Sequence, residues 1–255
     1  MDVPRFYRLK KLLAGAIPGP GPGASQVSRR LRLRRRILTY AFDDCHDYFS
    51  QYGQDKFVDQ VLFREQRNGV FLDVGAYDGV TINNSYFLER TRGWSGMCVE
   101  PQPAAFATLQ QARRAICING CAAPEDGVVD FLQLGGGNEM LSGRVGTFEP
   151  VHLDLIRAAT HQPAGEHAAV RVRAFNLPAL LREHGMDRVD FLSLDTEGGE
   201  LDLLKTLDLE ALQVRAITIE NNDGSPEVER YLAHAGYRLA AVMGCDEIYR
   251  RQDQG

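Results

Sequence analysis

Acidic side chains recur at the ends of short apolar runs in this sequence. Asp73 and Asp78 flank a glycine-containing segment, and Glu100 ends a second apolar run. Asp195 and Glu197 directly follow another run. Ionised carboxylates accept hydrogen bonds from hydroxyl groups, attract cations and can take up a proton. This pattern indicates a polar or cationic ligand and a place where a proton is removed.

The apolar runs alternate with helix-like segments, which indicates how these acids are positioned. The runs predict buried strands at residues 70–74, 96–100, 116–119, 190–194 and 216–220. The segments between and after them predict helices at residues 82–92, 103–113, 176–184, 199–207 and 226–235. Repeated strand–helix units predict an α/β fold, a doubly wound, mostly parallel, Rossmann-like sheet with helices on both faces. Two final strands, at 237–242 and 247–250, predict an antiparallel hairpin at one edge.

In such a sheet, ligands bind beyond the carboxyl ends of the strands, where the acids of this sequence are expected. Gly75 and Gly79 allow the chain after the first strand to turn tightly and to approach a ligand. Glu100, 27 residues beyond Asp73, is placed to accept hydrogen bonds from a ribose diol. The sequence therefore predicts a nucleoside ligand.

The acidic lining favours S-adenosylmethionine over NAD as the nucleoside ligand. A dinucleotide-binding loop would carry a second glycine where this chain has Ala76. A pyrophosphate would also be repelled by the carboxylates, whereas the sulfonium and ammonium groups of S-adenosylmethionine would be attracted. S-adenosylmethionine is therefore the predicted cofactor. An NAD-dependent sugar-modifying enzyme remains the alternative.

Five segments resemble the FkbM family of methyltransferases. They are residues 50–55, 71–79, 93–101, 190–200 and 219–221, and the resemblance covers roughly residues 50–250. It implies a class I methyltransferase fold, S-adenosylmethionine as methyl donor, and O-methylation of a sugar or another small metabolite.

The resemblance also implies which residues hold the donor. The implied set is Asp73, Gly75, Ala76, Asp78, Gly79, Glu100, Asn119 and Gln54. Within it, Asp73 orients the glycine loop, Asn119 begins a segment that borders the adenine, and Gln54 lies in a segment that packs over the cofactor. For that last segment, a helix start capped by Ser50 is an equal alternative.

The catalytic end allows two mechanisms. Asp195 or Glu197 would act as the base that removes the acceptor proton. Alternatively, Asp195 with Glu220 and Asn221 is similar to the magnesium site of catechol-type O-methyltransferases. Oxygen ligands suit Mg²⁺, and the metal would lower the pKa of the acceptor hydroxyl. We favour the direct base, because Glu220 is longer than the aspartate of that site.

Two parts of the chain do not follow the alternation of predicted strands and helices. Residues 1–49 form a basic extension with a Pro/Gly linker, ahead of a methyltransferase domain at 50–255. An insert at about 128–172 is expected to hold a strand-like segment at 128–134, a glycine loop at 135–137, and then an irregular stretch with three solvated histidines: His152, His161 and His167. It is expected to cover the pocket.

The charge distribution bears on partners and location. The overall net charge is −5, but residues 1–40 carry +9, which leaves −14 for the remainder. Six arginines between Arg29 and Arg36 could make weak contact with an anionic membrane. The acidic body argues against nucleic-acid binding by the core domain and fits a small-molecule acceptor. Five scattered cysteines without a Cys-x-x-Cys pair predict a cytoplasmic protein.

A non-enzymatic alternative is a catalytically silent Rossmann-like binding protein. It is weakened because Asp195, Glu197 and Glu220 are all present. The sequence gives no prediction of the oligomeric state.

Overall fold

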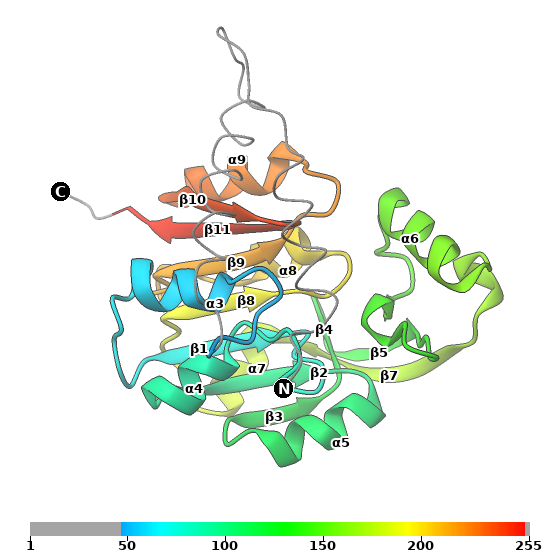
Figure 1. Cartoon of the computed structure of the whole chain (residues 1–255), viewed down its shortest axis with the longest axis horizontal. Coiled ribbons are helices and arrows are strands. Elements are labelled where there is room, and N and C mark those ends of the chain that lie inside the picture. The colour runs from blue at the N-terminus through cyan, green and yellow to red at the C-terminus, as the bar shows by residue number, and fades with distance from the viewer. Residues whose placement is uncertain (1–46, 253–255) are drawn as a thin grey trace, which may run out of the picture.

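A computed structural model describes residues 47–252, and its main sheet has seven strands (Figure 1). Their order is β10-β11-β9-β8-β1-β2-β3. The bounds are β1 Val70–Val74, β2 Ser95–Glu100, β3 Ile116–Asn119, β8 Phe191–Leu194, β9 Ala216–Glu220, β10 Tyr237–Met243 and β11 Asp246–Arg251. The first five are parallel, and β11 runs antiparallel to both of its neighbours. The predicted class I fold with an antiparallel edge hairpin is confirmed.

Helices cover both faces of this sheet, which explains why its central strands are mostly apolar. The helices are α3 Gln54–Phe57, α4 Tyr86–Arg92, α5 Pro103–Ala112, α7 Leu177–Glu183, α8 Glu200–Thr206 and α9 Pro226–His234, and a π-helical turn, η1, spans Val58–Leu62. Successive strand residues face opposite sides, so Phe71 joins one core and Leu72 the other. The sheet is thus held rigidly between two apolar layers.

Helix α4 begins at Tyr86, four residues later than the predicted start at Ile82. Ile82 has a φ of +45°, which is incompatible with a helix. The side-chain oxygen of Asn83 accepts hydrogen bonds from the backbone N–H groups of Ser85 (3.0 Å) and Tyr86 (2.8 Å). Asn83 therefore caps the helix, and the residues before it form a loop.

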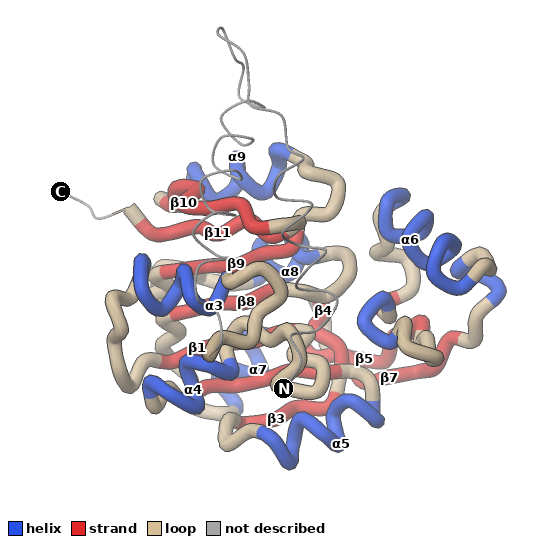
Figure 2. The backbone as a smooth tube through the Cα atoms, viewed as in Figure 1, coloured by secondary structure: helices blue, strands red, loops and turns tan. Residues whose placement is uncertain are grey.

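The insert forms a second sheet with the order β4-β7-β5-β6, to the right of the main sheet in Figure 1. Its strands are β4 Cys121–Ala123, β5 Gly127–Leu132, β6 Gly143–Arg144 and β7 Ala169–Asn176. The predicted strand at 128–134 is confirmed by β5, but the expectation of an irregular stretch after it was wrong, because that stretch holds the 11-residue helix α6, Pro150–Thr160 (Figure 2). Pro150 occupies the first turn of α6, and Ile156 is fully buried on its inner face.

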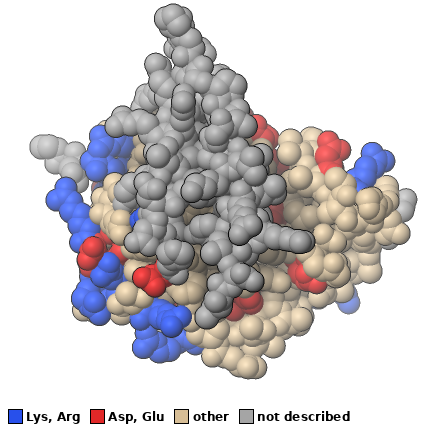
Figure 3. All heavy atoms as spheres, viewed as in Figure 1, with Lys and Arg blue, Asp and Glu red and all other residues tan. Residues whose placement is uncertain are grey.

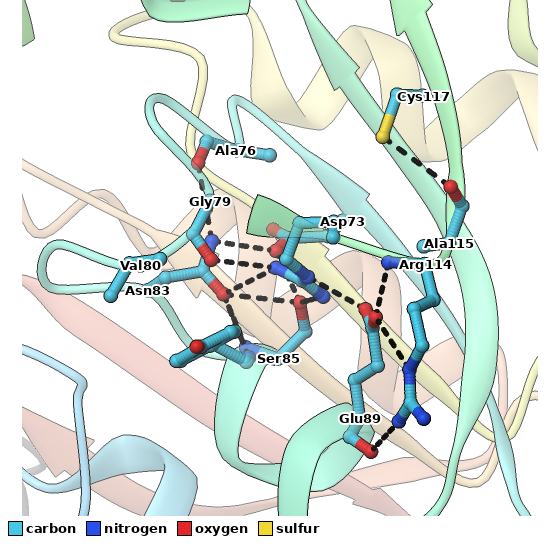
Figure 4. A network of polar contacts seen from close by, with 12 residues as sticks. Asp73, Ala76, Gly79, Val80, Asn83, Ser85, Glu89, Arg114, Ala115 and Cys117 are labelled. Atoms are coloured by element: carbon cyan, nitrogen blue, oxygen red, sulfur yellow. Dashed lines mark hydrogen bonds and ion pairs between the residues drawn. The ribbon is translucent and has the colours of Figure 1, made fainter. Parts of the chain in front are cut away.

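A buried polar network ties the loop after β1 to α4 (Figure 4). One oxygen of Asp73 accepts hydrogen bonds from Asn83 (2.9 Å) and from the Ser85 hydroxyl (2.5 Å). The Arg113 guanidinium donates to Ser85 (2.8 Å) and pairs with Glu89 at 2.6 Å. The side chain of Arg113 is fully buried and that of Glu89 is 4% exposed. These paired charges fix the conformation of residues 73–85.

The described chain begins inside this fold. The ring of Tyr48 lies 4.1 Å from that of Phe87, and Phe49 lies 4.7 Å from Tyr86. The predicted extension up to residue 46, with the arginines from Arg29 to Arg36, lies outside the described residues. Within residues 47–252, none of the helices has the length and apolar character needed to cross a membrane.

Trp94, the single tryptophan, lies just before β2, at the amino ends of the parallel strands. It is 2% exposed, and its indole N–H donates to the Gln66 carbonyl at 2.8 Å. Its ring meets Phe63 edge to face at 4.9 Å. Trp94 is therefore a packing residue at the end of the sheet opposite to the loops that follow the strands.

Replacing Glu89 with alanine is expected to lower the free energy of unfolding by about 3–5 kcal/mol, because the buried Arg113 would keep an uncompensated charge. Urea denaturation would measure the loss. Arg114→Ala is the matched control: Arg114 also approaches Glu89, at 3.8 Å, but is 76% exposed, so its removal should cost under about 1 kcal/mol. A loss below about 1 kcal/mol in Glu89→Ala would contradict the structural role of the pair.

Candidate active site

A cavity opens at the carboxyl ends of β1, β2 and β8 and is closed on one side by the insert. It has about 560 Å³ of empty space, which includes a part open to solvent. Its lining includes Gly75, Glu100, Asp195 and Glu197, which the sequence predicted for the site. We call it the donor cavity.

Gly75 brings two strand ends together at the donor cavity. Its φ is +85°, and a Cβ at this position would lie 1.6 Å from the Asp195 carbonyl oxygen. The backbone N–H groups of Gly75 and Ala76 both donate to the Val99 carbonyl, at 2.9 and 3.2 Å. Only glycine fits this approach, so Gly75 sets the spacing between the loops after β1 and β8.

Glu100 ends β2 and presents a buried carboxylate to the donor cavity. Its two oxygens accept hydrogen bonds from the backbone N–H groups of Gln102 and Tyr77, each at 2.8 Å. The side chain is 3% exposed. Burial raises the pKa of Glu100 to about 7, although the two N–H groups favour the ionised form. Each carboxylate oxygen keeps a further lone pair for a ligand.

Other residues of the predicted donor set support the loops and do not line the cavity. Asp73 belongs to the network described above, and Ala76 is buried. One oxygen of Asp78 accepts hydrogen bonds from the N–H groups of Val80 (2.9 Å) and Thr81 (2.7 Å), which is turn chemistry. Gly79 has a φ of +79° and packs against Leu109.

Asn119 and Gln54 also lie outside the lining of the cavity. The Asn119 amide donates to the Glu100 carbonyl at 2.9 Å, and the next residues, from Gly120 to Ala122, reach the lining. Gln54 is 1% exposed and donates to the carboxylate of Asp246. Gly53, and not Ser50, is the N-cap of α3; the Ser50 hydroxyl accepts from the Asp55 backbone N–H at 3.2 Å and donates to the Asp55 carboxylate.

Three carboxylates gather at the far end of the donor cavity. Single oxygens of Asp195, Glu197 and Glu220 all lie within 4.8 Å of one another. Burial, and then the charge of the neighbouring carboxylates, raises the pKa of both Asp195 and Glu220 well above the ordinary values. A set this crowded favours binding a proton or a cation.

Asn221 is not part of this carboxylate cluster. Its amide donates to the Ser225 carbonyl at 2.9 Å and accepts from the Ser225 N–H at 3.1 Å, so it holds the loop after β9. Glu197 instead stands beside Asp195 and Glu220.

His152 of the insert is buried, so the expectation that it is solvated was wrong. It is 1% exposed, and its Nδ1 lies 2.9 Å from an oxygen of Glu197. Burial alone would lower the pKa of His152, but the contact with Glu197 outweighs it and raises the pKa above the ordinary value. Sequence periodicity gave no sign of this contact, which depends on the placement of α6.

The donor cavity also includes residues that sequence reasoning did not single out. From the main sheet these are Tyr77 and Gln102, which neighbour predicted positions, and Thr196. From the insert they are Phe131, Met140 and Ser142. Nothing in the local sequence marks the insert residues, because only the second sheet brings them to the cavity.

Comparisons with known proteins agree with this geometry. The model of the methyltransferase FkbM domain matches residues 73–239. The sequence has no match among curated proteins. Among solved structures, methyltransferase FkbM from Methylobacillus flagellatus KT is similar, with a TM-score of 0.50 and 13% identity over 96% of this chain. This chain spans 59% of the length of that protein.

More distant similarity is found to a human methyltransferase 10 domain containing protein. The TM-score is 0.40 and the identity 10%, over 89% of this chain and 98% of that one. The family match covers more than half of the chain and includes the ends of β1, β2, β8 and β9, where the site lies. The chain therefore belongs to the FkbM methyltransferase family.

Proposed function

We propose that this protein uses S-adenosylmethionine to methylate a hydroxyl group of a small-molecule acceptor, such as a sugar. The observation that carries the proposal is the donor cavity, with Glu100 at one end and the carboxylates of Asp195 and Glu197 at the other. A nucleoside ribose suits the first end. A cationic sulfonium suits the second, since no Lys or Arg belongs to the lining within the described residues.

The donor would be held by the backbone around Gly75 and by Glu100. The open lone pairs of the Glu100 carboxylate would accept hydrogen bonds from the ribose hydroxyls. The lining beside Glu100 includes the small side chains Cys121 and Ala122, which leave room for a flat adenine ring. When bound, the donor supplies an electrophilic methyl group for in-line transfer.

The chain's own residues would align the acceptor and accept its proton. Asp195 and Glu197 both line the donor cavity, so a hydroxyl placed beside them faces the methyl group. A raised pKa makes Asp195 a stronger base than a solvated carboxylate. Either residue could take up the hydroxyl proton as the new C–O bond forms.

A Mg²⁺ ion is the second candidate for activating the hydroxyl. The spacing of Asp195, Glu197 and Glu220 favours it, because carboxylate oxygens are the ligands that Mg²⁺ prefers. These three residues would hold the ion and thereby offset their mutual repulsion. Asn221, which the sequence suggested as a ligand, is committed to its own loop.

Small acceptors are favoured over nucleic acids because no Lys or Arg of the described residues lines the donor cavity. In Figure 3, Lys and Arg side chains gather mainly on the left, on the side away from the insert. The donor cavity lies at the carboxyl ends of the strands, on the side of the insert. A phosphate backbone needs basic side chains around the reactive site.

S-adenosylmethionine is expected to raise the melting temperature and NAD is not, because the acidic lining attracts a sulfonium and repels a pyrophosphate. Thermal shift with each ligand would measure this. Incubation with methyl-labelled S-adenosylmethionine and fractionated host metabolites would then identify the acceptor. Stabilisation by NAD alone would contradict the proposal, and donor binding without any transfer would favour a silent binding protein.

Donor affinity is expected to rise with pH as Glu100 ionises around its pKa of about 7. A carboxylate accepts ribose hydrogen bonds better than a carboxylic acid does, so binding should be weaker at pH 6 than at pH 8. Glu100→Gln should bind about 10- to 100-fold more weakly at pH 8, the loss of bonds to a charged group, and should lack this pH dependence. Calorimetry would measure the donor dissociation constant of both proteins at each pH. If the affinity of Glu100→Gln still changed with pH, a group other than Glu100 would be responsible for the pH dependence.

The base and metal mechanisms differ in their response to chelation. With a direct base, activity survives a chelator, and Asp195→Asn or Glu197→Gln lowers the rate about 10²–10⁴-fold. With Mg²⁺, chelation abolishes turnover, added Mg²⁺ restores it, and donor binding is unchanged. Asp202→Asn, an acid on α8 with a 66% exposed side chain, is the control and should retain full activity. Full activity of both site variants would exclude the direct base.

A further inference from the structure

A buried contact between an imidazole and a carboxylate joins the insert to the main domain. His152 projects from α6, and its Nδ1 lies 2.9 Å from Oε2 of Glu197, in the loop after β8. The imidazole is 1% exposed and stacks on the ring of Phe148 at 5.1 Å with an interplanar angle of 6°. The ring is thus fixed in one orientation, on the insert side of the carboxylate cluster.

The two ring nitrogens of His152 face different oxygens: Nε2 makes a hydrogen bond, whereas Nδ1 makes a close contact without hydrogen-bond geometry. Nε2 lies 3.0 Å from the backbone carbonyl of Leu141, which can only accept, so this nitrogen carries a hydrogen. Nδ1 faces the Glu197 carboxylate. One side chain therefore connects α6, the turn that contains Leu141, and the loop after β8.

The Glu197 backbone depends on this support. Glu197 has a φ of +59°, an uncommon conformation for a residue with a side chain. The next residue, Gly198, has a φ of +127°, and a Cβ there would lie 2.5 Å from the Thr147 carbonyl of the insert. The insert thus presses directly on the loop that carries Glu197.

The same pair lies between two cavities. The insert contributes Phe131, Met140 and Ser142 to the donor cavity, and Glu197 lies in the same lining. Glu197 and His152 also border a smaller neighbouring cavity. Losing the pair would both loosen the insert over the donor cavity and free the Glu197 carboxylate to turn.

We propose that His152 is a positioning residue that fastens the insert over the bound donor and holds the Glu197 carboxylate toward the methyl group. The consequence for Glu197 rests on the proposed function. The fastening of the insert follows from the contacts alone.

Two substitutions separate the contacts of His152. Asparagine places an N–H donor at the position of Nδ1, and glutamine places one at the position of Nε2, since each matches the number of bonds from Cβ. His152→Asn therefore keeps the contact with Glu197, whereas His152→Gln keeps only the contact with Leu141.

The measurement is the dissociation rate of methyl-labelled S-adenosylmethionine from the full chain. His152→Gln is expected to dissociate about 10- to 100-fold faster than the unmodified protein, because the contact between the insert and Glu197 is lost, and His152→Asn within about 3-fold of it. Equal acceleration in both variants would mean that the histidine has a packing role only. An unchanged rate in His152→Gln would also overturn the proposal.

His161→Asn is the control, because His161 is exposed at the end of the same helix, with a φ of +59° that asparagine tolerates. It should dissociate at the unmodified rate. Hydrogen exchange of residues 150–160 and 195–199 in the ligand-free protein adds an independent arm: exchange should accelerate in His152→Gln and not in His152→Asn. If the unmodified protein binds no S-adenosylmethionine, the proposed function fails, and this exchange comparison still decides whether His152 fastens the insert.

Discussion

The contact between Gly75 and the backbone of Asp195 is the constraint on which the site depends. The loops after β1 and β8 meet where a side chain at Gly75 would collide with the Asp195 carbonyl. This approach places the Gly75 turn and Asp195 in the lining of one cavity. The polar network from Asp73 to Arg113 holds the rest of the β1 loop behind it, so the cavity is shaped before any ligand arrives.

The insert supplies a cover for the donor cavity and a partner for Glu197, neither of which the main sheet provides. The sheet offers carboxylates at three strand ends, those of β2, β8 and β9. The second sheet and the turn between its strands β5 and β6 add apolar cover over the donor cavity through Phe131 and Met140, and α6 adds an imidazole beside Glu197 through His152. Excluding water from this side strengthens every electrostatic interaction within the cavity.

The sequence allowed the main sheet to be predicted closely, because apolar runs and helix caps are local signals. The strand at 216–220 and the edge hairpin are confirmed. Of the predicted site residues, Gly75, Glu100, Asp195 and Glu197 meet at one cavity, since their placement follows from parallel strand ends. Asp78 and Asn221 hold local turns, and Asn119 binds the neighbouring strand β2. These roles depend on side-chain competition, and α6 with His152 was missed because it depends on long-range packing.

The position of Trp94 has a practical consequence for spectroscopy. Its indole is buried at the amino ends of the strands, against Phe63, while the donor cavity lies at the carboxyl ends. Its fluorescence should therefore shift sharply when the whole domain unfolds and hardly at all when a ligand enters. Trp94 fluorescence thus reports on unfolding of the whole domain and not on ligand binding at the donor cavity. A second fluorophore, attached to α6, would be needed to detect movement of the insert.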